Sequence, residues 1–337
     1  MNNSKKNTEK VLDNNLIWKN LFSNPKDYKA SFKFILIFLI SLLICYFISS
    51  FFSGDLYIPI NVSELPSGIG QSFPFSIASI IELIAMGPIF SIIFYILIKL
   101  LINKIDKNHG KNKYWIFIIE IISVITIGVL VAGHFIHLTY NYASHLYDVQ
   151  HGGYETTELF LLLYWADEWL GHHMIHIAFF SQIVLALSAT YLIKNKRMMK
   201  WDEVVLSIFL GFGLFIVMGF ASYEGQCAAL LMILCLILLV IEVIFILIKK
   251  INPLRNSILL VSIISNIIVI GFYFFWIGSY GQKSYYPFIY QPSELPFSFD
   301  IMDHILLLMF FLPVIYFSTL AIEILRRYVK NKKIEGK

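Results

Sequence analysis

Long apolar runs separated by short charged connectors dominate the chain. A run of about 18 or more apolar residues is long enough to cross the hydrocarbon core of a membrane as a helix, and the 337 residues contain eight such runs. They lie at roughly 34–53, 76–98, 114–138, 158–193, 204–222, 226–248, 257–277 and 303–325. The pattern predicts an all-α, polytopic integral membrane protein with eight transmembrane helices.

Composition supports this fold class and removes several classes of function. Apolar residues make up 58% of the chain and charged residues only 14%, whereas about 25% of residues are charged in soluble domains. Mean hydropathy is +0.72. These values exclude a soluble enzyme, a nucleic-acid-binding protein and a disordered scaffold. All three cysteines lie within apolar runs, so the sequence indicates no disulfide framework.

Lysine and arginine fall almost entirely in alternate connectors. The N-terminal arm, 99–113, 194–200, 249–255 and the tail after 325 hold 25 of the 26 basic residues. Because cytoplasmic loops of membrane proteins are enriched in Lys and Arg, we expect a cell-membrane protein with both termini in the cytoplasm. The expected organisation is a polar cytoplasmic arm (1–32), an eight-helix transmembrane domain (33–327) and a basic cytoplasmic tail (328–337).

Eight of the nine histidines lie on the opposite, extracytoplasmic side of the expected topology; only His109 belongs to a basic connector. The depth of the others follows from counting about 20 residues, at about 1.5 Å each, from the basic anchor of each helix. The count ends near His134 in the third run, near His173 and His176 in the fourth, and near His304 in the eighth. Three helices should therefore bring histidines to one level, near the outer boundary of the hydrocarbon.

The third and fourth helices should extend beyond the outer surface, over about 139–165. At 100° per residue, the third run carries a single polar stripe about 80° wide. Its members are His134, His137, Asn141, His145 and Asp148. The stripe predicts that the third helix continues until Gly152 and Gly153 break it.

The histidines and carboxylates on these helices predict a metal site. Imidazole is the commonest protein ligand for metals, and spacings of i, i+3 and i+4 let one helix supply several ligands. The predicted ligands are His134, His137, His172 and His176, followed by His173, Asp303 and His304. Nitrogen and carboxylate ligands without a nearby cysteine favour a transition metal, zinc or iron first and copper as a further candidate.

Nearby carboxylates could ligate the metal, orient a ligand or act as a catalytic general base. These are Glu168 and Asp167, which precede the fourth-helix histidines, and Glu82, which lies within an apolar run. An ionisable group inside a membrane span is a functional candidate by default. Glu120 and Glu242 lie nearer the cytoplasmic ends, where they could reach the interface or pair with a loop lysine, and no role is predicted for them.

The motifs His-x-x-His at 134–137 and His-His-x-x-His at 172–176 resemble the histidine boxes of membrane fatty-acid hydroxylases and desaturases. Clustered histidines hold a di-iron centre in that family, but its boxes typically read His-x-x-His-His and lie on the cytoplasmic side. The set is also similar to the CREST membrane hydrolases, which hold zinc with three histidines and an aspartate. Here Asp303-His304 stands in place of their late His-x-x-x-His. The resemblances imply oxygen chemistry and hydrolysis, respectively.

Three functions fit these residues. The expected one is an outward-facing metalloenzyme, a hydrolase or oxidoreductase whose metal activates water or oxygen against a membrane lipid or another apolar substrate. The first alternative is a transporter for a metal ion or a proton-coupled solute, in which the histidines bind the solute first and Glu82 and Glu120 continue the path. The second is a haem-b redox protein that uses facing histidines of two helices.

Overall fold

The computed structural model describes residues 29–48, 57–59, 72–106, 110–151, 157–193, 197–281 and 289–290. Six helical segments among them are long and apolar enough to cross a membrane, which indicates a multi-pass membrane protein. They are Ser79–Ile102, Gly110–Ser144, Glu158–Leu192, Trp201–Tyr223, Ala228–Ile248 and Ser257–Tyr280. The first expected span forms a shorter apolar helix, Ala30–Cys45, and the eighth, 303–325, lies outside the described residues.

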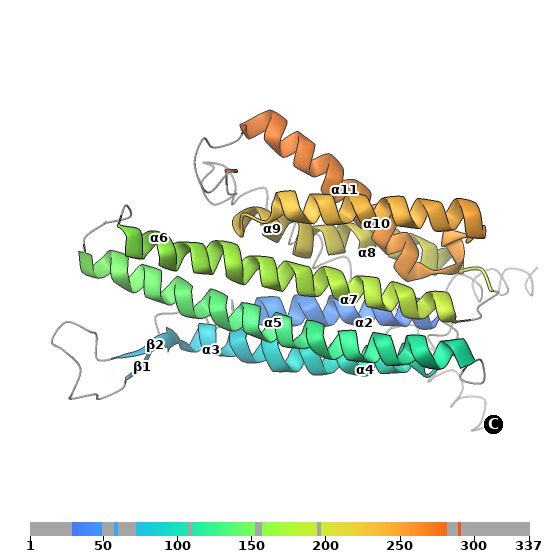
Figure 1. The fold of residues 1–337 in the computed structure, drawn as a ribbon, viewed down its shortest axis with the longest axis horizontal. Coiled ribbons are helices and arrows are strands. Elements are labelled where there is room, and N and C mark those ends of the chain that lie inside the picture. The colour runs from blue at the N-terminus through green and yellow to red at the C-terminus, as the bar shows by residue number, and fades with distance from the viewer. Residues whose placement is uncertain are drawn as a thin grey trace, which may run out of the picture. The chain divides into compact units, whose positions relative to one another are not determined.

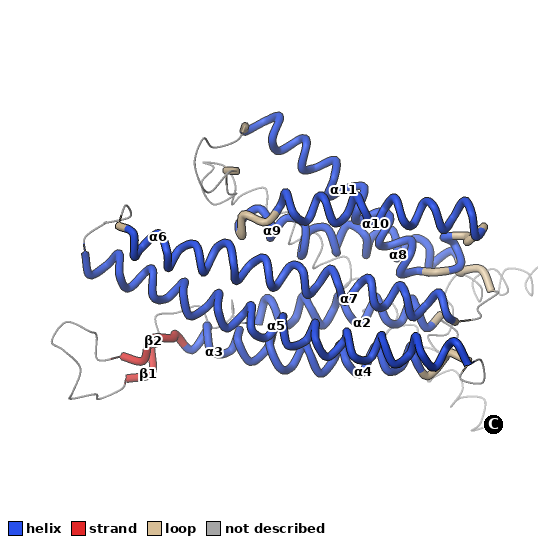
Figure 2. Tube along the Cα trace, viewed as in Figure 1, coloured by secondary structure: helices blue, strands red, loops and turns tan. Residues whose placement is uncertain are grey.

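Helices form the architecture (Figures 1 and 2). In chain order they are α2 (Ala30–Ile48), α3 (Ile77–Ile84), η3 (Ala85–Ile89), α4 (Phe90–Ile102), α5 (Gly110–His151), α6 (Glu158–Tyr164), η4 (Trp165–Gly171), α7 (His172–Leu192), α8 (Trp201–Leu214), η5 (Phe215–Phe220), α9 (Ala221–Glu224), α10 (Ala228–Lys249), η6 (Pro253–Arg255) and α11 (Ser257–Tyr280). η3, η4 and η5 are π-helical, and η6 is a 3₁₀ turn. Two short antiparallel strands, β1 (Tyr57–Pro59) and β2 (Ser72–Ser76), precede α3 and were not expected from the sequence.

The long helices α5 and α6–η4–α7 lie side by side (Figure 1). α5 continues to His151, as its polar stripe predicts, and the following segment runs without a break from Glu158 to Leu192. Thr157 caps the start of α6, since its hydroxyl accepts a hydrogen bond from the backbone nitrogen of Phe160 at 3.3 Å. These two helices carry most of the candidate site.

Phenylalanine rings hold α2, α4 and α7 together. Phe38 of α2 packs edge-on against Phe90 of α4 with ring centroids 5.3 Å apart, and Phe90 meets Phe179 of α7 at 5.5 Å. All three side chains are buried. Aromatic pairs in this geometry contribute about 0.5–1.5 kcal/mol beyond the area they bury, so the cluster fixes the helices behind the candidate site.

A buried carboxylate joins the basic ends of several helices. Glu203 of α8 is fully buried and accepts hydrogen bonds from the backbone nitrogen of Lys29 at 2.7 Å and from the Arg197 guanidinium at 3.0 Å. The ammonium of Lys29 donates to the backbone oxygen of Arg255 at 2.5 Å. One carboxylate therefore ties the start of α2 to the loop before α8, and Lys29 extends the connection to the start of α11.

We predict that Glu203→Gln lowers the free energy of unfolding by about 2 kcal/mol, because hydrogen bonds to a buried charge are lost. The measurement is SDS titration in mixed micelles. Glu120→Gln is the matched control. Its carboxylate accepts from Lys99 at 2.6 Å, which is one of the two possibilities that the sequence left open, but about a third of each side chain is exposed. Such pairs contribute less than about 1 kcal/mol. Equal losses in the two variants would contradict this assignment.

We also predict a pH dependence that comes from Lys29. Its burial, and then the guanidinium of Arg197, lower the pKa of Lys29 from 10.5 to about 8, although Glu203 acts in the opposite direction. Between these two pH values the unfolded chain holds the proton more tightly, so the contribution of Lys29 to stability rises with pH. Wild type should gain stability relative to Lys29→Met from pH 8 to pH 10, as measured by SDS titration. A constant difference between the two proteins over this range would contradict the prediction.

Candidate metal centre

The backbones of α5 and η4 approach each other closely at Gly171. A Cβ atom at this position would lie 2.9 Å from the backbone nitrogen of His137. One helical turn earlier on α5, a Cβ on Gly133 would lie 2.9 Å from the Cβ of Met174. Small residues permit such crossings between membrane helices. This crossing places the polar stripe of α5 directly against the stretch from Asp167 to His176.

The π-helical turn η4 changes which fourth-span side chains point at α5. In a π-helix the hydrogen-bonded residues are five apart, which is the spacing of Asp167 and His172. Asp167 is buried, and its Oδ1 accepts a hydrogen bond from Nδ1 of His137 at 2.5 Å. This bond fixes the orientation of the His137 ring and leaves its Nε2 available as a ligand.

His172 completes a group of three possible ligands. Its ring lies edge-on to that of His137, with centroids 4.3 Å apart. One ligand atom from each of His137, Asp167 and His172 lies within 4.8 Å of the other two. The group is therefore compact enough for one ion to contact all three residues.

Glu168 and the turn after α9 form two walls around His172. The Oε2 atom of Glu168 lies 3.9 Å from Nε2 of His172. A Cβ atom on Gly225 would lie 2.3 Å from the His172 ring. Gln226 follows in a left-handed conformation, with φ of 51°, and its side-chain amide donates to the backbone oxygen of Ile289 at 3.2 Å. A chain segment distant in sequence thus supports the wall that confines this ring.

His134 and His176 lie beside the group of three and are more deeply buried than its two histidines. The Nδ1 of His134 donates to the backbone oxygen of Leu130 at 3.2 Å, which leaves its Nε2 available as an acceptor or ligand. The ring of His176 lies 6.3 Å from that of His172, and its Nδ1 is buried without a hydrogen-bond partner. A buried polar atom without a partner is costly, and a bound ion or water would remove that cost.

The remaining predicted residues are placed differently. His173 lies against Trp169, with ring centroids 4.4 Å apart, and its Nδ1 donates to the backbone oxygen of Trp169 at 2.6 Å. Glu82, on α3, is close enough to His137 for their charges to interact. Asp303 and His304 lie outside the described residues.

The site is buried on one side and accessible on the other. His134, His176 and Asp167 are each at most 5% exposed, whereas 16–17% of the side-chain surface of His137, His172 and Glu168 is accessible. Imidazole nitrogens and a carboxylate form a ligand set typical of zinc or iron. The arrangement could hold a metal ion at the accessible edge, with Glu168 beside it as an acid or base.

Sequence reasoning missed two parts of this arrangement. At 3.6 residues per turn, Glu168 shares a helix face with His172 and His176. No sequence pattern marks the π-helical turn that brings Asp167 toward His137. The sequence analysis also predicted no role for Gly171 and Gly225. The signal available for Gly171 is its position in a membrane span, three residues after the carboxylate Glu168 and directly before His172.

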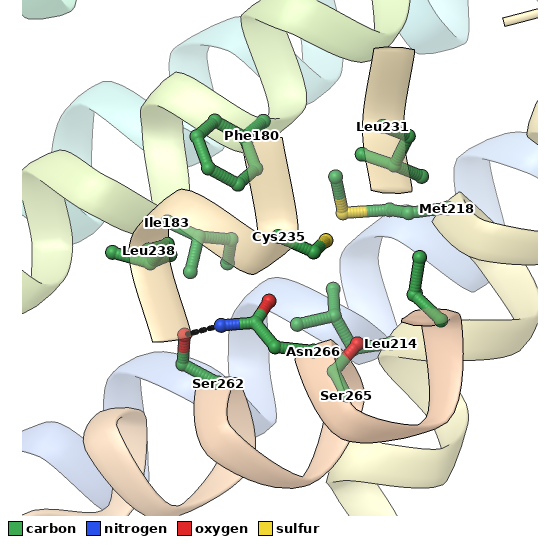
Figure 3. Close-up of a pocket in the computed structure, with 11 residues that line it drawn as sticks. Phe180, Ile183, Leu214, Met218, Leu231, Cys235, Leu238, Ser262, Ser265 and Asn266 are labelled. Atoms are coloured by element: carbon green, nitrogen blue, oxygen red, sulfur yellow. Dashed lines mark hydrogen bonds between the residues drawn. The ribbon is translucent and has the colours of Figure 1, made fainter. Parts of the chain in front are cut away.

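A second polar cluster lies away from the site, beside a cavity of about 20 Å³ between α7, α10 and α11 (Figure 3). The Nδ2 of Asn266 donates to Ser262 and to Glu242, each at 3.3 Å. Glu242 is fully buried and bonded to Asn266, so it neither reaches the interface nor pairs with a loop lysine as the sequence suggested. The cavity is large enough for a water molecule but not for a lipid substrate.

No protein-family model, curated protein or solved structure matches the chain.

We predict that Gly225→Ala weakens metal binding at least about tenfold without altering a ligand, because the added methyl group displaces the His172 ring. Competition with a chromophoric chelator on detergent-purified protein provides the measurement. Gly128→Ala is the control, since among the described residues a Cβ at Gly128 would meet nothing within 4 Å beyond its own turn of α5. Equal affinity of Gly225→Ala and Gly128→Ala would show that the wall does not position His172.

Proposed function

We propose that the protein is an outward-facing, metal-dependent membrane enzyme that acts on a lipid or another apolar substrate. In this proposal the chain crosses the cell membrane eight times, with both termini in the cytoplasm and the histidine cluster near the outer headgroups. The observation that carries the proposal is the convergence of His137, Asp167 and His172 from two helices into one compact ligand group.

The residues take distinct roles in this proposal. His137 and His172 bind a zinc or iron ion, while Asp167 ligates it or orients His137 through the hydrogen bond at Nδ1. His134 and His176 extend the ligand set on the buried side. When bound, the ion activates water or oxygen. Glu168, beside His172 at the accessible edge, exchanges the proton.

The surface next to the cluster suits an apolar substrate. Trp165 and Trp169 stack with ring centroids 5.2 Å apart and are 40% and 36% exposed. Leu161 and Leu162, one turn earlier, are more than half exposed. Tryptophan favours the boundary between hydrocarbon and headgroups, so a substrate that enters from the outer leaflet would pass these side chains.

The geometry favours an enzyme over the two alternatives. If His137 and His172 bound opposite faces of a haem, their ring centroids would be separated by two iron–nitrogen bonds of about 2 Å each plus the radii of both rings. The centroids lie only 4.3 Å apart, which is too close. A transport path through Glu82 and Glu120 is also disfavoured, because Glu120 already pairs with Lys99.

We predict that purified protein holds about one zinc or up to two irons per chain, and that His172→Ala or Asp167→Asn lowers metal affinity about 10- to 100-fold. Metal analysis by mass spectrometry and the visible spectrum test this. Zinc would select hydrolysis of fluorogenic acyl ester or amide lipids as the assay, and iron would select oxygen consumption with the same lipids.

His173→Ala is the matched control. His173 is adjacent to His172 in sequence, but its side chain packs on Trp169 and is not one of the three possible ligands. The metal content of this variant should stay within about twofold of wild type, because the His173 ring bonds to the backbone of Trp169 and orients none of the three possible ligands. Folded wild-type protein that binds neither metal, or equal losses in His172→Ala and His173→Ala, would refute the proposed function.

A further inference from the structure

A second polar pocket lies at the opposite, basic end of the helices, with a volume of about 250 Å³. Ala30 and Ser31 of α2, the last turn of α7, the residues after α10 and the start of α11 form its walls. Its polar lining includes Ser31, Thr190, Lys250, Asn252, Arg255 and Asn256. The volume is many times the roughly 10–15 Å³ that a single water requires, so the pocket can hold a small chemical group.

Two cations face this pocket without a counter-charge in its lining. Lys250 and Arg255 are both exposed, and none of the residues that form the pocket is acidic. At this end of the helices the carboxylate of Glu203 is buried and bonded to Arg197 and to the backbone nitrogen of Lys29, and it does not line the pocket. The pocket therefore carries a net positive charge within the described residues.

Most of its neutral polar groups are already used within the fold. The Asn256 side chain accepts from the backbone nitrogen of Ile258 at the start of α11 and donates to Thr190 at 2.7 Å. The hydroxyl of Ser31 accepts from the backbone nitrogen of Ser257 at 3.3 Å. The Nε of Arg255 donates to the sulfur of Met198 at 3.4 Å, so the ammonium of Lys250 and the terminal guanidinium nitrogens of Arg255 remain for a ligand. These charged donors select an anion such as phosphate.

The backbone adds to this preference. α11 begins next to the pocket and is 24 residues long. Its first backbone N–H groups bond to Ser31 and Asn256, so the helix contributes only the partial positive charge of its dipole. Lys29, close by, has a pKa lowered to about 8 by its burial and then by the guanidinium of Arg197, with a smaller contribution from Arg255.

The surroundings indicate that the phosphate comes from a lipid. Ile193 and Ile251 give the pocket an apolar side. Leu247 and Ile248, just before Lys250 at the end of α10, are each 70% exposed. The pocket thus adjoins the end of an apolar membrane span, where acyl chains would contact these residues.

We propose that this pocket binds the phosphate group of an anionic lipid headgroup, with Lys250 and Arg255 as its ligands. Basic pockets between transmembrane helices bind anionic headgroups by this chemistry. This site is separate from the histidine cluster and does not depend on the enzyme being active.

Binding of dioctanoyl phosphatidic acid to full-length protein in neutral detergent, followed by native mass spectrometry, tests the proposal. The double variant Lys250→Gln/Arg255→Gln should bind at least about tenfold more weakly, as expected from the loss of two charges near an anionic headgroup. Lys104→Gln/Lys113→Gln is the matched control, because it removes the same charge from two exposed lysines outside the pocket. It should weaken binding less than about threefold.

Two further ligands identify the source of the phosphate. Dioctanoyl phosphatidylcholine should bind at least about tenfold more weakly than phosphatidic acid, because its headgroup has no net charge. Inorganic phosphate should compete only at far higher concentration, because it lacks acyl chains. Effective competition by inorganic phosphate would overturn the lipid assignment.

Equal losses in the two double variants would overturn the site itself, because they would show attraction to general surface charge. Tight binding of phosphatidylcholine would do the same, because it would show recognition of acyl chains alone. If the double variant does not fold, Lys250→Gln alone replaces it, because that substitution changes only an exposed side chain. Unchanged binding of phosphatidic acid to Lys250→Gln would also count against the site.

Discussion

The close approach of α5 to the π-helical segment η4 is the constraint on which the candidate site depends. Gly171 allows the backbone of the fourth span to touch α5 at His137. A side chain there would separate the helices, and Asp167 could then no longer reach the imidazole. Because the bond between these residues orients His137 while Gly225 confines His172, backbone packing determines the geometry of all three possible ligands.

The two ends of the described helices use charge in different ways. At the basic end, Glu203 is enclosed by donors from other elements, so its charge serves to hold the helices together. At the histidine end, Nδ1 of His176 is buried without a hydrogen-bond partner among the described residues. Such an unpaired group costs free energy, and its position beside the three possible ligands is the physical reason for assigning a function to that end.

The sequence predicted the helices better than the site. Apolar run length located the six long spans, and the polar stripe of α5 correctly extended that helix to His151, because both depend on local composition. The grouping of the ligands was harder to predict from the sequence, since a single π-helical turn alters the phase between Asp167 and the histidines that follow. The role of Gly225 could not be predicted for another reason: it depends on a contact with His172, which is more than fifty residues away in sequence.

Anomalous X-ray diffraction at the metal absorption edge, from crystals of the purified protein, locates any bound ion. We expect a peak about 2.0–2.2 Å from a nitrogen of both His137 and His172, with Asp167 in contact either with the ion or with His137. A metal peak remote from these residues, or no peak in folded protein supplied with zinc and iron, would contradict this expectation.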